Sequence, residues 1–480
     1  MSDAHPWELV VGLEVHVQLR TATKIFCDCP TSFGDPPNVN TCPVCLGLPG
    51  ALPVLNQQAV ALAVRAALAL GCDLHEASVF ARKNYFYPDL PKGYQISQFD
   101  RPFATGGEVQ LDDDGSRHIR LTRIHMEEDA GRSVHDRYPG ASAIDLNRAG
   151  VPLIEIVSEP ELRSAQDARL YLQRLKEVLE FTAVSDANME EGSLRVDANV
   201  SVRRSGASAL GTRTEIKNMN SFSGVERAIE IEFARQCSVL DAAGGIVQQT
   251  MLWDGARGEV RPARSKEGSH DYRYFPEPDL PPLHLDHVWI TQQREALPEL
   301  PAARRARLRQ THGLSAYDAG VLTSSRALSD FFEEVVARHS DARVAATWVM
   351  GEVLAWLKEQ RADIAAFPMQ PTTLAELLDA VRAGALSRTA AKRVFDVLLR
   401  DGGTVAAIAE REGLAQVGDV DALGAWVDEV WQAHPAEAAR LVAGEKKLLG
   451  VLVGLVMKAS GGRADPRRVN ELLQARAAGA

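Results

Sequence analysis

The sequence predicts an α+β protein in which a strand-rich first part is followed by a helical second part. Up to about residue 285, polar and apolar residues alternate in short segments separated by Gly and Pro. Within this part, apolar residues at three- and four-residue spacing predict helices over Gln57–Leu70 and Ala165–Phe181. Beyond about Glu299 the alternation disappears, and the apolar stripe of Leu374–Val381 is typical of a core-facing helix. A large mixed sheet with packed helices, followed by helical domains, is therefore expected.

Two breaks divide the chain into three expected domains. The proline-rich segment Pro276–Pro282 closes the strand-rich part, and Asp401–Gly403 interrupts the helical part. We therefore expect domains over residues 1–293, 294–405 and 406–480.

Composition favours a soluble protein of a reducing compartment. Six cysteines in 480 residues are too few for a secreted disulfide framework. No apolar run reaches the length of a membrane span, and the first residues lack the pattern of a signal peptide. We expect a cytoplasmic location and no membrane association. The net charge of −11 argues against non-specific coating of nucleic acid, although a local basic patch can still bind RNA.

Four cysteines near the start have the spacing of a zinc knuckle. Cys27, Cys29, Cys42 and Cys45 form a C-x-C-x12-C-x2-C array. Four thiolates fill a tetrahedral zinc shell and leave no open position for water, so a structural Zn²⁺ is expected.

The segment before the cysteines predicts a strand with one polar face. Between Val10 and Leu19, strict alternation places Glu14 and His16 on the same face. A carboxylate and an imidazole side by side could bind a metal ion or a phosphate-bearing cofactor.

Further polar strand faces indicate a Mg-nucleotide site. Ser193–Arg203 alternates so that Arg195, Asp197 and Asn199 share a face, and Thr214–Asn218 places Glu215 beside Lys217. Carboxylates are the hard ligands of Mg²⁺, and Arg or Lys neutralises phosphate. For any one strand, a solvated outer sheet face remains the alternative.

The common nucleotide and hydrolase motifs are absent from the sequence. It contains no P-loop, no G-x-G-x-x-G after a strand and no G-x-S-x-G elbow. The aromatic and basic stretch Arg82–Tyr94 could stack on a nucleotide, or it could pack over the core; physics alone leaves both open.

Six blocks of unusual residue combinations resemble one family, the B subunit of the aspartyl/glutamyl-tRNA amidotransferase. The resemblance covers essentially the whole chain, without departure in the blocks and with all four cysteines present. The blocks are Gly12–Leu19, Arg82–Asp89 with Tyr94–Gln98, His125–Gly131, Asp145–Arg148 with Pro152–Pro160, Met189–Arg195, and Asp271–Asp279.

The resemblance implies a tRNA-dependent ligase that works in a heterotrimer. Its substrates would be mischarged Glu-tRNA(Gln), Asp-tRNA(Asn) or both, and the sequence does not choose between them. ATP would phosphorylate the side-chain carboxylate of the esterified amino acid, because a carboxylate resists attack until its oxygen becomes a good leaving group. Ammonia released from glutamine by the amidase subunit would then displace the phosphate. The expected trimer also contains a third, small subunit, and a non-discriminating aminoacyl-tRNA synthetase is a possible further partner.

The resemblance also assigns roles to residues. The expected Mg²⁺ ligands are Glu14, His16, Glu128 and Glu215, with Glu127 as a neighbour. Arg195 and Lys217 would neutralise phosphate charge in the transition state. Asp197 and Asn199 complete the catalytic set, in which the residue that orients ammonia is left open. The expected nucleotide contacts are Lys83, Tyr85, Asn147 and Ser158.

The family fold is a cradle-shaped catalytic domain, a helical domain and a helical tail that touches tRNA. The charge of the C-terminal segment agrees with that use: eight basic residues stand against three acidic ones between Arg440 and Ala480. A solvated helix surface is the alternative. The residues expected to contact nucleic acid are Lys446, Lys447, Lys458, Arg463, Arg467 and Arg468.

Two functions from other classes are weaker alternatives. A stand-alone RNA-binding protein would use the knuckle and the tail but would not need the acidic strand faces. An ATP-dependent ligase of a small free acid would use those faces but would not need the basic tail.

Overall fold

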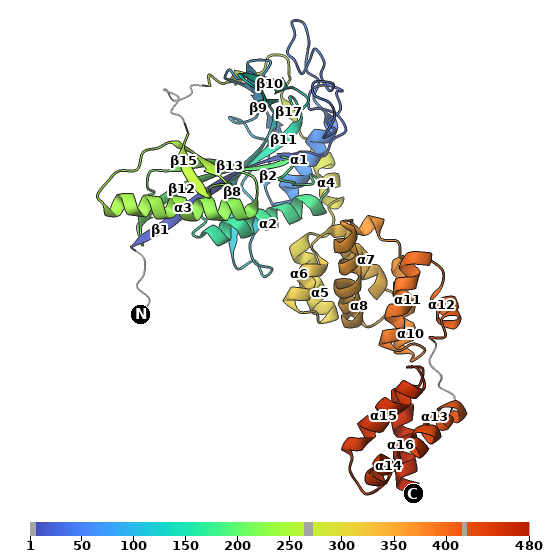
Figure 1. The fold of residues 1–480 in the computed structure, drawn as a ribbon. Coiled ribbons are helices and arrows are strands. Elements are labelled where there is room, and N and C mark those ends of the chain that lie inside the picture. The colour runs from blue at the N-terminus through green and yellow to red at the C-terminus, as the bar shows by residue number, and fades with distance from the viewer. Residues whose placement is uncertain (1–5, 264–271, 415–419, 480) are drawn as a thin grey trace. The chain divides into compact units, whose positions relative to one another are not determined.

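The computed structural model describes residues 6–263, 272–414 and 420–479, and it confirms the α+β class. The chain divides into two compact units, Met1–Ala306 and Arg307–Ala480. The first unit contains a large mixed sheet with helices packed on it, and the elements of the second unit are helices (Figure 1).

The strands that the described residues form all belong to the first unit. They are β1 (Trp7–Gln18), β2 (Asp73–Leu74), β3 (Ala77–Ser78), β4 (Ala81–Asn84), β5 (Tyr94–Ser97), β6 (Ala104–Thr105), β7 (Glu108–Gln110), β8 (His118–Glu128), β9 (Arg132–Tyr138), β10 (Ala141–Asp145), β11 (Pro152–Ser158), β12 (Leu194–Arg204), β13 (Thr214–Met219), β14 (Thr250–Asp254), β15 (Glu259–Pro262), β16 (Phe275–Pro276) and β17 (Leu283–His284).

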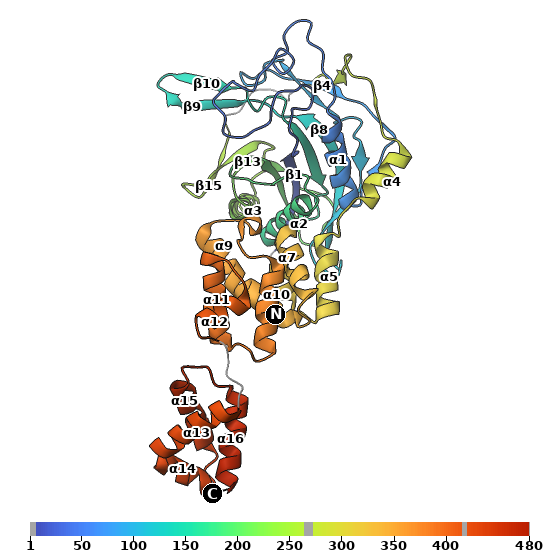
Figure 2. The same cartoon turned by 90° about the vertical axis from the view of Figure 1, so that its right-hand side faces the viewer.

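Strand β1 runs through the middle of the main sheet. The strand order is β15-β14-β13-β12-β1-β11-β8-β5-β4-β16, and β1 pairs antiparallel with β12 on one side and with β11 on the other. A separate two-stranded sheet, β9 with β10, projects from the unit (Figure 2).

Helices cover one face of the sheet. They are α1 (Gln57–Ala69), α2 (Ala165–Phe181) and α3 (Phe222–Asp241), and α2 lies beside α3 along the sheet (Figure 1). Helix α4 (His287–Glu295) packs against α1. The apolar face of β1, including Val11, Leu13 and Val15, is fully buried in this core. The opposite face of the same strands therefore carries the polar side chains.

Local sequence explains where these helices begin. Asn56 accepts hydrogen bonds from two backbone N–H groups at the start of α1, and Ser164 and Ser221 each accept one at the start of α2 and α3. The predicted helices over 57–70 and 165–181 are confirmed. Helix α3 was not predicted, because its buried stripe contains Glu232 and Gln236 and so does not look apolar.

The helices from α5 onward make two further cores. One lies among residues 308–409 and the other among residues 423–473. The stripe of Leu374–Val381 lies in α10, as expected, and α11 ends at Asp401. The domain boundaries at 293/294 and 405/406 stay predictions. These helices are α5 (Pro301–His312), α6 (Ala316–Leu322), α7 (Arg326–Val336), α8 (Ala342–Trp348), η1 (Val349–Val353), α9 (Leu354–Gln360), η2 (Ile364–Ala366), α10 (Pro371–Arg382), α11 (Arg388–Asp401), α12 (Val405–Arg411), α13 (Val420–Ala433), α14 (Pro435–Val442), α15 (Lys447–Ala459) and α16 (Pro466–Gly479).

Among the described residues, no helix has both the length and the apolar character that crossing a bilayer requires.

Candidate active site

The polar face of the central strands gathers charged residues from five strands. Strand register sets the neighbours: Glu14 of β1 lies opposite Asp197 of β12, and His16 lies opposite Arg195 of β12 and Glu155 of β11. On β13, Glu215 lies opposite Asn199 of β12. Because opposite residues in an antiparallel pair point to the same face, these side chains meet.

Three carboxylates form the first cluster of this face. Oxygen atoms of Glu14, Asp197 and Glu215 all lie within 4.8 Å of one another. Asn199 donates a hydrogen bond to Glu14 at 2.9 Å. The Lys217 ammonium lies 2.6 Å from an oxygen of Asp197 and 3.1 Å from one of Glu215. One lysine against three carboxylates leaves negative charge that a cation can neutralise.

Electrostatics in this cluster favours a bound cation. Burial and the charge of Glu155 raise the pKa of Glu14, although the hydrogen bond from Asn199 acts in the other direction. Burial by itself would lower the pKa of Lys217, but the neighbouring carboxylates Asp197 and Glu215 raise it. Oxygen ligands of this kind are the ones that Mg²⁺ and Ca²⁺ use, so the residues present fit Mg²⁺.

Two histidines and two glutamates form the second cluster. Nε2 of His16 lies 3.6 Å from Glu127 and 3.4 Å from Glu155. Nε2 of His125 lies 3.7 Å and 3.5 Å from the same two carboxylates. Ligand atoms of His16, Glu127 and Glu155 are all within 4.8 Å of one another, which makes this a second possible cation site.

Opposite charges stabilise one another in the second cluster. Burial alone would raise the pKa of Glu155, but the hydrogen bond with His16 and the nearby imidazoles hold it well below its usual range. Burial alone would lower the pKa of His16, and Glu155 and Glu127 raise it above its ordinary value.

Asp129 connects this face to Arg195. Its carboxylate accepts a hydrogen bond from Arg195 at 2.9 Å and one from Gln18 at 2.8 Å. Arg148 lies 3.6 Å away. Although burial would raise the pKa of Asp129, the two guanidinium groups hold it below its usual range. Arg195 is thus held at a fixed position at the edge of the polar face.

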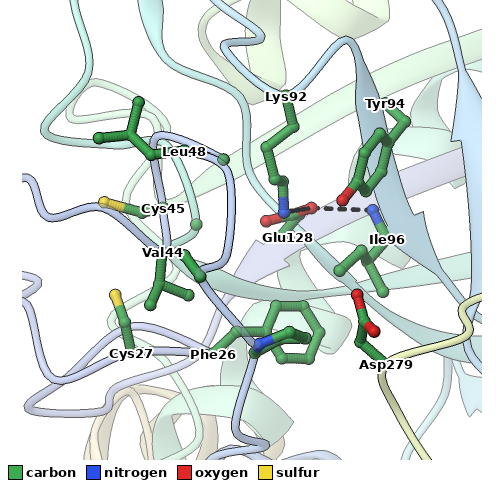
Figure 3. Close-up of a pocket in the computed structure, with 14 residues that line it drawn as sticks. Phe26, Cys27, Val44, Cys45, Leu48, Lys92, Tyr94, Ile96, Glu128 and Asp279 are labelled. Carbon is green, nitrogen blue, oxygen red and sulfur yellow. Dashed lines mark hydrogen bonds and ion pairs between the residues drawn. The ribbon is translucent and has the colours of Figure 1, made fainter.

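Glu128 lies apart from both clusters. Along β8, His125, Glu127 and Asp129 point to one face, so the intervening Glu128 points to the other. Its carboxylate forms an ion pair with Lys92 and accepts a hydrogen bond from the Ile96 N–H at 2.9 Å (Figure 3). The ion pair lines a cavity of about 120 Å³ whose wall also includes Cys27 and Cys45. The structure therefore splits the predicted Mg²⁺ set, with Glu14 and Glu215 in the first cluster and His16 in the second.

The four predicted zinc ligands converge. The sulfur atoms of Cys27, Cys29, Cys42 and Cys45 lie within 4.8 Å of one another. A hydrogen bond from Cys27, helped by the neighbouring ammonium of Lys24, lowers the pKa of Cys45 to about 4. Tetrahedral thiolate sites of this kind bind Zn²⁺, so the donor set fits that ion.

Lys24 is a buried cation beside the cysteines. Its side chain is fully buried, and its ammonium lies 2.7 Å from the Asn40 carbonyl oxygen and 3.6 Å from Sγ of Cys45. Within the described ranges no carboxylate pairs with it. A buried ammonium needs a compensating negative charge, and four thiolates around one Zn²⁺ carry a net charge of −2.

Lys24→Met should weaken zinc binding about 10- to 100-fold, the usual effect of losing a residue that supports metal ligands. The reason is the loss of the ammonium that offsets the thiolate charge. Competition with a chelator of known affinity measures this. Lys358→Met, at an exposed position in α9, is the control and should retain the parental affinity. Equal zinc affinity in both variants would contradict the role of Lys24.

The predicted nucleotide contacts fall into two groups. Lys83 lies 5.0 Å from the centre of the Tyr272 ring and 5.8 Å from that of Tyr85, and its charge acts on Glu155. In contrast, Ser158 accepts a hydrogen bond from the Leu13 N–H, and the Asn147 amide bonds Asn40 and Pro36. Ser158 and Asn147 thus hold the fold together, and nucleotide contact by any of the four stays a prediction.

The basic residues predicted to contact nucleic acid are exposed in the second unit. Lys446, Lys447 and Lys458 lie at the two ends of α15, and Arg467 and Arg468 lie in the first turn of α16. Arg463 lies 5.5 Å over the Trp426 ring.

No role was predicted for Glu155, Asp129 or Lys24, although Asp129 belongs to an acidic segment that the sequence marks as typical of a Mg-nucleotide site. Glu155 carried a usable signal, because it is the one charged residue in the apolar strand Pro152–Ser158. Asp129 continues the alternation of His125 and Glu127. Nothing local marks Lys24, which is recognised only once the cysteines are placed around it.

Two family models match the chain. The GatB/GatE catalytic domain matches residues 9–291, and the GatB domain matches residues 330–476. Curated relatives match nearly end to end. The protein of Moorella thermoacetica is 52% identical over 98% of this chain and 99% of its own length. That of Chlorobium chlorochromatii is 53% identical over 97% and 98% of the two chains. Both are named as the B subunit of aspartyl/glutamyl-tRNA(Asn/Gln) amidotransferase.

Proposed function

The chain belongs to the family of the B subunit of aspartyl/glutamyl-tRNA(Asn/Gln) amidotransferase, and from this premise we propose that its polar sheet face activates a tRNA-bound carboxylate. The reaction is the ATP-dependent conversion of Glu-tRNA(Gln), Asp-tRNA(Asn) or both to the amide. The γ-phosphoryl group of ATP passes to the side-chain carboxylate of the esterified amino acid. Ammonia then forms the C–N bond as phosphate leaves.

One observation carries this proposal: two acidic clusters and two fixed cations share one sheet face. Mg²⁺ held by these clusters would supply positive charge that offsets the phosphate charge of ATP. Glu14, Asp197 and Glu215 would hold one ion, and His16, Glu127 and Glu155 fit a second. A pair of carboxylate-rich clusters beside fixed cations suits phosphoryl transfer, which depends on position and electrostatics more than on covalent chemistry.

The chain's own cations would act on developing charge. Lys217 and Arg195 are held in place by carboxylates before substrate binds, so they need no reorganisation when phosphate charge develops. Asp197 and Asn199 lie beside Lys217 and Glu14. Either side chain could orient ammonia, and the Asp197 carboxylate could accept its proton.

Ammonia would come from partners. We propose that the chain works with two partner subunits, of which one is an amidase and the other is small, and that the cysteine site holds a structural Zn²⁺. We further propose that residues 1–293 form the catalytic domain, 294–405 a helical domain and 406–480 a tail that binds tRNA.

A transamidation assay tests the proposal. The chain, co-purified with its partner subunits, is given ATP, glutamine and either mischarged tRNA. Formation of Gln-tRNA or Asn-tRNA supports it. Activity of the isolated chain on free glutamate would instead indicate a small-acid ligase, and tRNA binding without ATP-dependent chemistry would indicate an RNA-binding protein.

Deleting residues 406–480 should weaken tRNA binding and flatten its salt dependence. Each lost phosphate contact lowers the salt slope by about one unit. ATP binding should remain, because the polar sheet face belongs to the first unit and the deleted helices belong to the second. Binding titrations at several salt concentrations provide the measurement. A truncated complex with the parental affinity and slope would show that the basic surface is only solvated.

A further inference from the structure

A second cavity adjoins the polar face at the end of β1. It has a volume of about 420 Å³, within the range of about 300–1,000 Å³ typical of small-ligand sites. Its wall includes Gln18, Phe33, Arg132, Arg148, Glu190 and Glu191, and we call it the Phe33 pocket. None of these residues has a role in the chemistry proposed above.

The pocket is connected to the active site through Asp129. Gln18 and Arg148 of the pocket wall both contact the Asp129 carboxylate, which also holds Arg195. Gln18 shares a strand face with His16 and Glu14. At the usual rise along a strand, Gln18 lies about 7 Å from His16 and about 13 Å from Glu14.

Two side chains of the wall have free binding groups. The Phe33 ring is 71% exposed although it lines a cavity. The guanidinium of Arg132 makes no hydrogen bond or ion pair with any described residue. An exposed ring is a platform for a nucleobase, and a free guanidinium binds phosphate.

The remaining charges select among nucleotides. Four carboxylates and two guanidinium groups line the pocket, so its charge is negative on balance. A polyphosphate such as ATP would be repelled. A nucleotide with one phosphate and an esterified amino acid carries a cationic α-ammonium group, and Glu190 or Glu191 could accept its hydrogen bonds. The carboxylates of both residues lack a partner among the described residues.

We infer that the Phe33 pocket binds the 3′-terminal adenosine of the aminoacyl-tRNA. The base stacks on Phe33, Arg132 pairs with the phosphate of the terminal nucleotide, and the α-ammonium group faces Glu190 and Glu191. The aminoacyl group then extends along β1, where its side-chain carboxylate reaches the metal clusters. Standard bond lengths give roughly 12 Å from the base to that carboxylate, which matches the distance along the strand. This inference rests on the proposed function.

The test compares tRNA that has its terminal adenosine with tRNA that lacks it. The parental full chain should bind the complete tRNA about tenfold more tightly, the fold-change that one base stacked on an aromatic ring gives. Phe33→Ala should bind both tRNAs alike, and so should Arg132→Gln, which changes an exposed side chain without a partner among the described residues. Tyr317→Ala is the control, because that aromatic ring is 74% exposed in the second unit. It should keep the parental preference.

A second comparison addresses the α-ammonium group. The parental chain should bind Glu-tRNA more tightly than N-acetylated Glu-tRNA, and the double variant Glu190→Gln, Glu191→Gln should lose this difference. A Phe33→Ala chain that keeps the preference for terminal adenosine overturns the inference. The inference is also overturned if the Phe33→Ala chain loses affinity for ATP measured without tRNA, because the pocket would then be an ATP site. Transamidation by the parental complex is measured in parallel, so that failure of the proposed function can be distinguished from failure of the inference about the Phe33 pocket.

Discussion

Glu14→Gln is expected to reduce ATP-dependent transamidation by more than about 100-fold while glutamine hydrolysis by the complex continues. Replacing a carboxylate by an amide removes one of the three charges that would hold Mg²⁺, and losses around metal ligands commonly reach this size. Release of ADP that depends on mischarged tRNA, measured beside glutamate production, separates the two activities.

The matched control for this variant is Glu8→Gln. Glu8 lies on the same strand and pairs with Arg203, outside both acidic clusters. It should keep near-parental activity. Equal loss of both activities in Glu14→Gln would show failed assembly rather than lost metal binding.

Cys42→Ser is expected to lower the zinc content from about one ion per chain to near zero. Structural zinc binding contributes on the order of 10 kcal/mol of folding free energy in small domains. Loss of the ion should therefore loosen the segment that contains the four cysteines, and limited proteolysis should cut there first. Metal analysis and thiol titration provide the measurements.

Cys237→Ser is the control for the cysteine variant. Cys237 is also buried, but it lies in α3 outside the cysteine cluster. This variant should retain its zinc. Parental protein that contains no zinc and has four freely reactive thiols would refute the assignment.

Local alternation predicted which residues share a face but not which strands meet. The pairs Glu14 with His16 and Asp197 with Arg195 could be read from single strands. Register between strands depends on contacts between distant segments. The sequence therefore could not predict that Glu14, Asp197 and Glu215 meet in one cluster. The same alternation, applied strictly to β8, would have separated Glu127 from Glu128.

Buried polar residues explain why helix α3 and the position of Lys24 were not predicted from the sequence. Helix α3 was missed because Glu232 lies in its buried stripe, where it bonds Thr214 of β13 and Arg235. Nothing in the local sequence marks Lys24, yet it is fully buried beside Cys45. Such residues are stable inside only because distant segments supply their partners, and no local pattern shows that.

The central position of β1 has a consequence for the order of folding. This strand is synthesised before both of its partners, β11 and β12, which follow much later in the chain. Contacts between such distant segments form slowly, and an unpaired strand with an apolar face is prone to aggregate. A nascent chain that stops before β12 would lack Asp197 and would leave the edge of β1 unpaired. The proposed metal ligands are therefore expected to assemble only late in the folding of the first unit, and a chaperone that shields β1 until then would protect the proposed catalytic site.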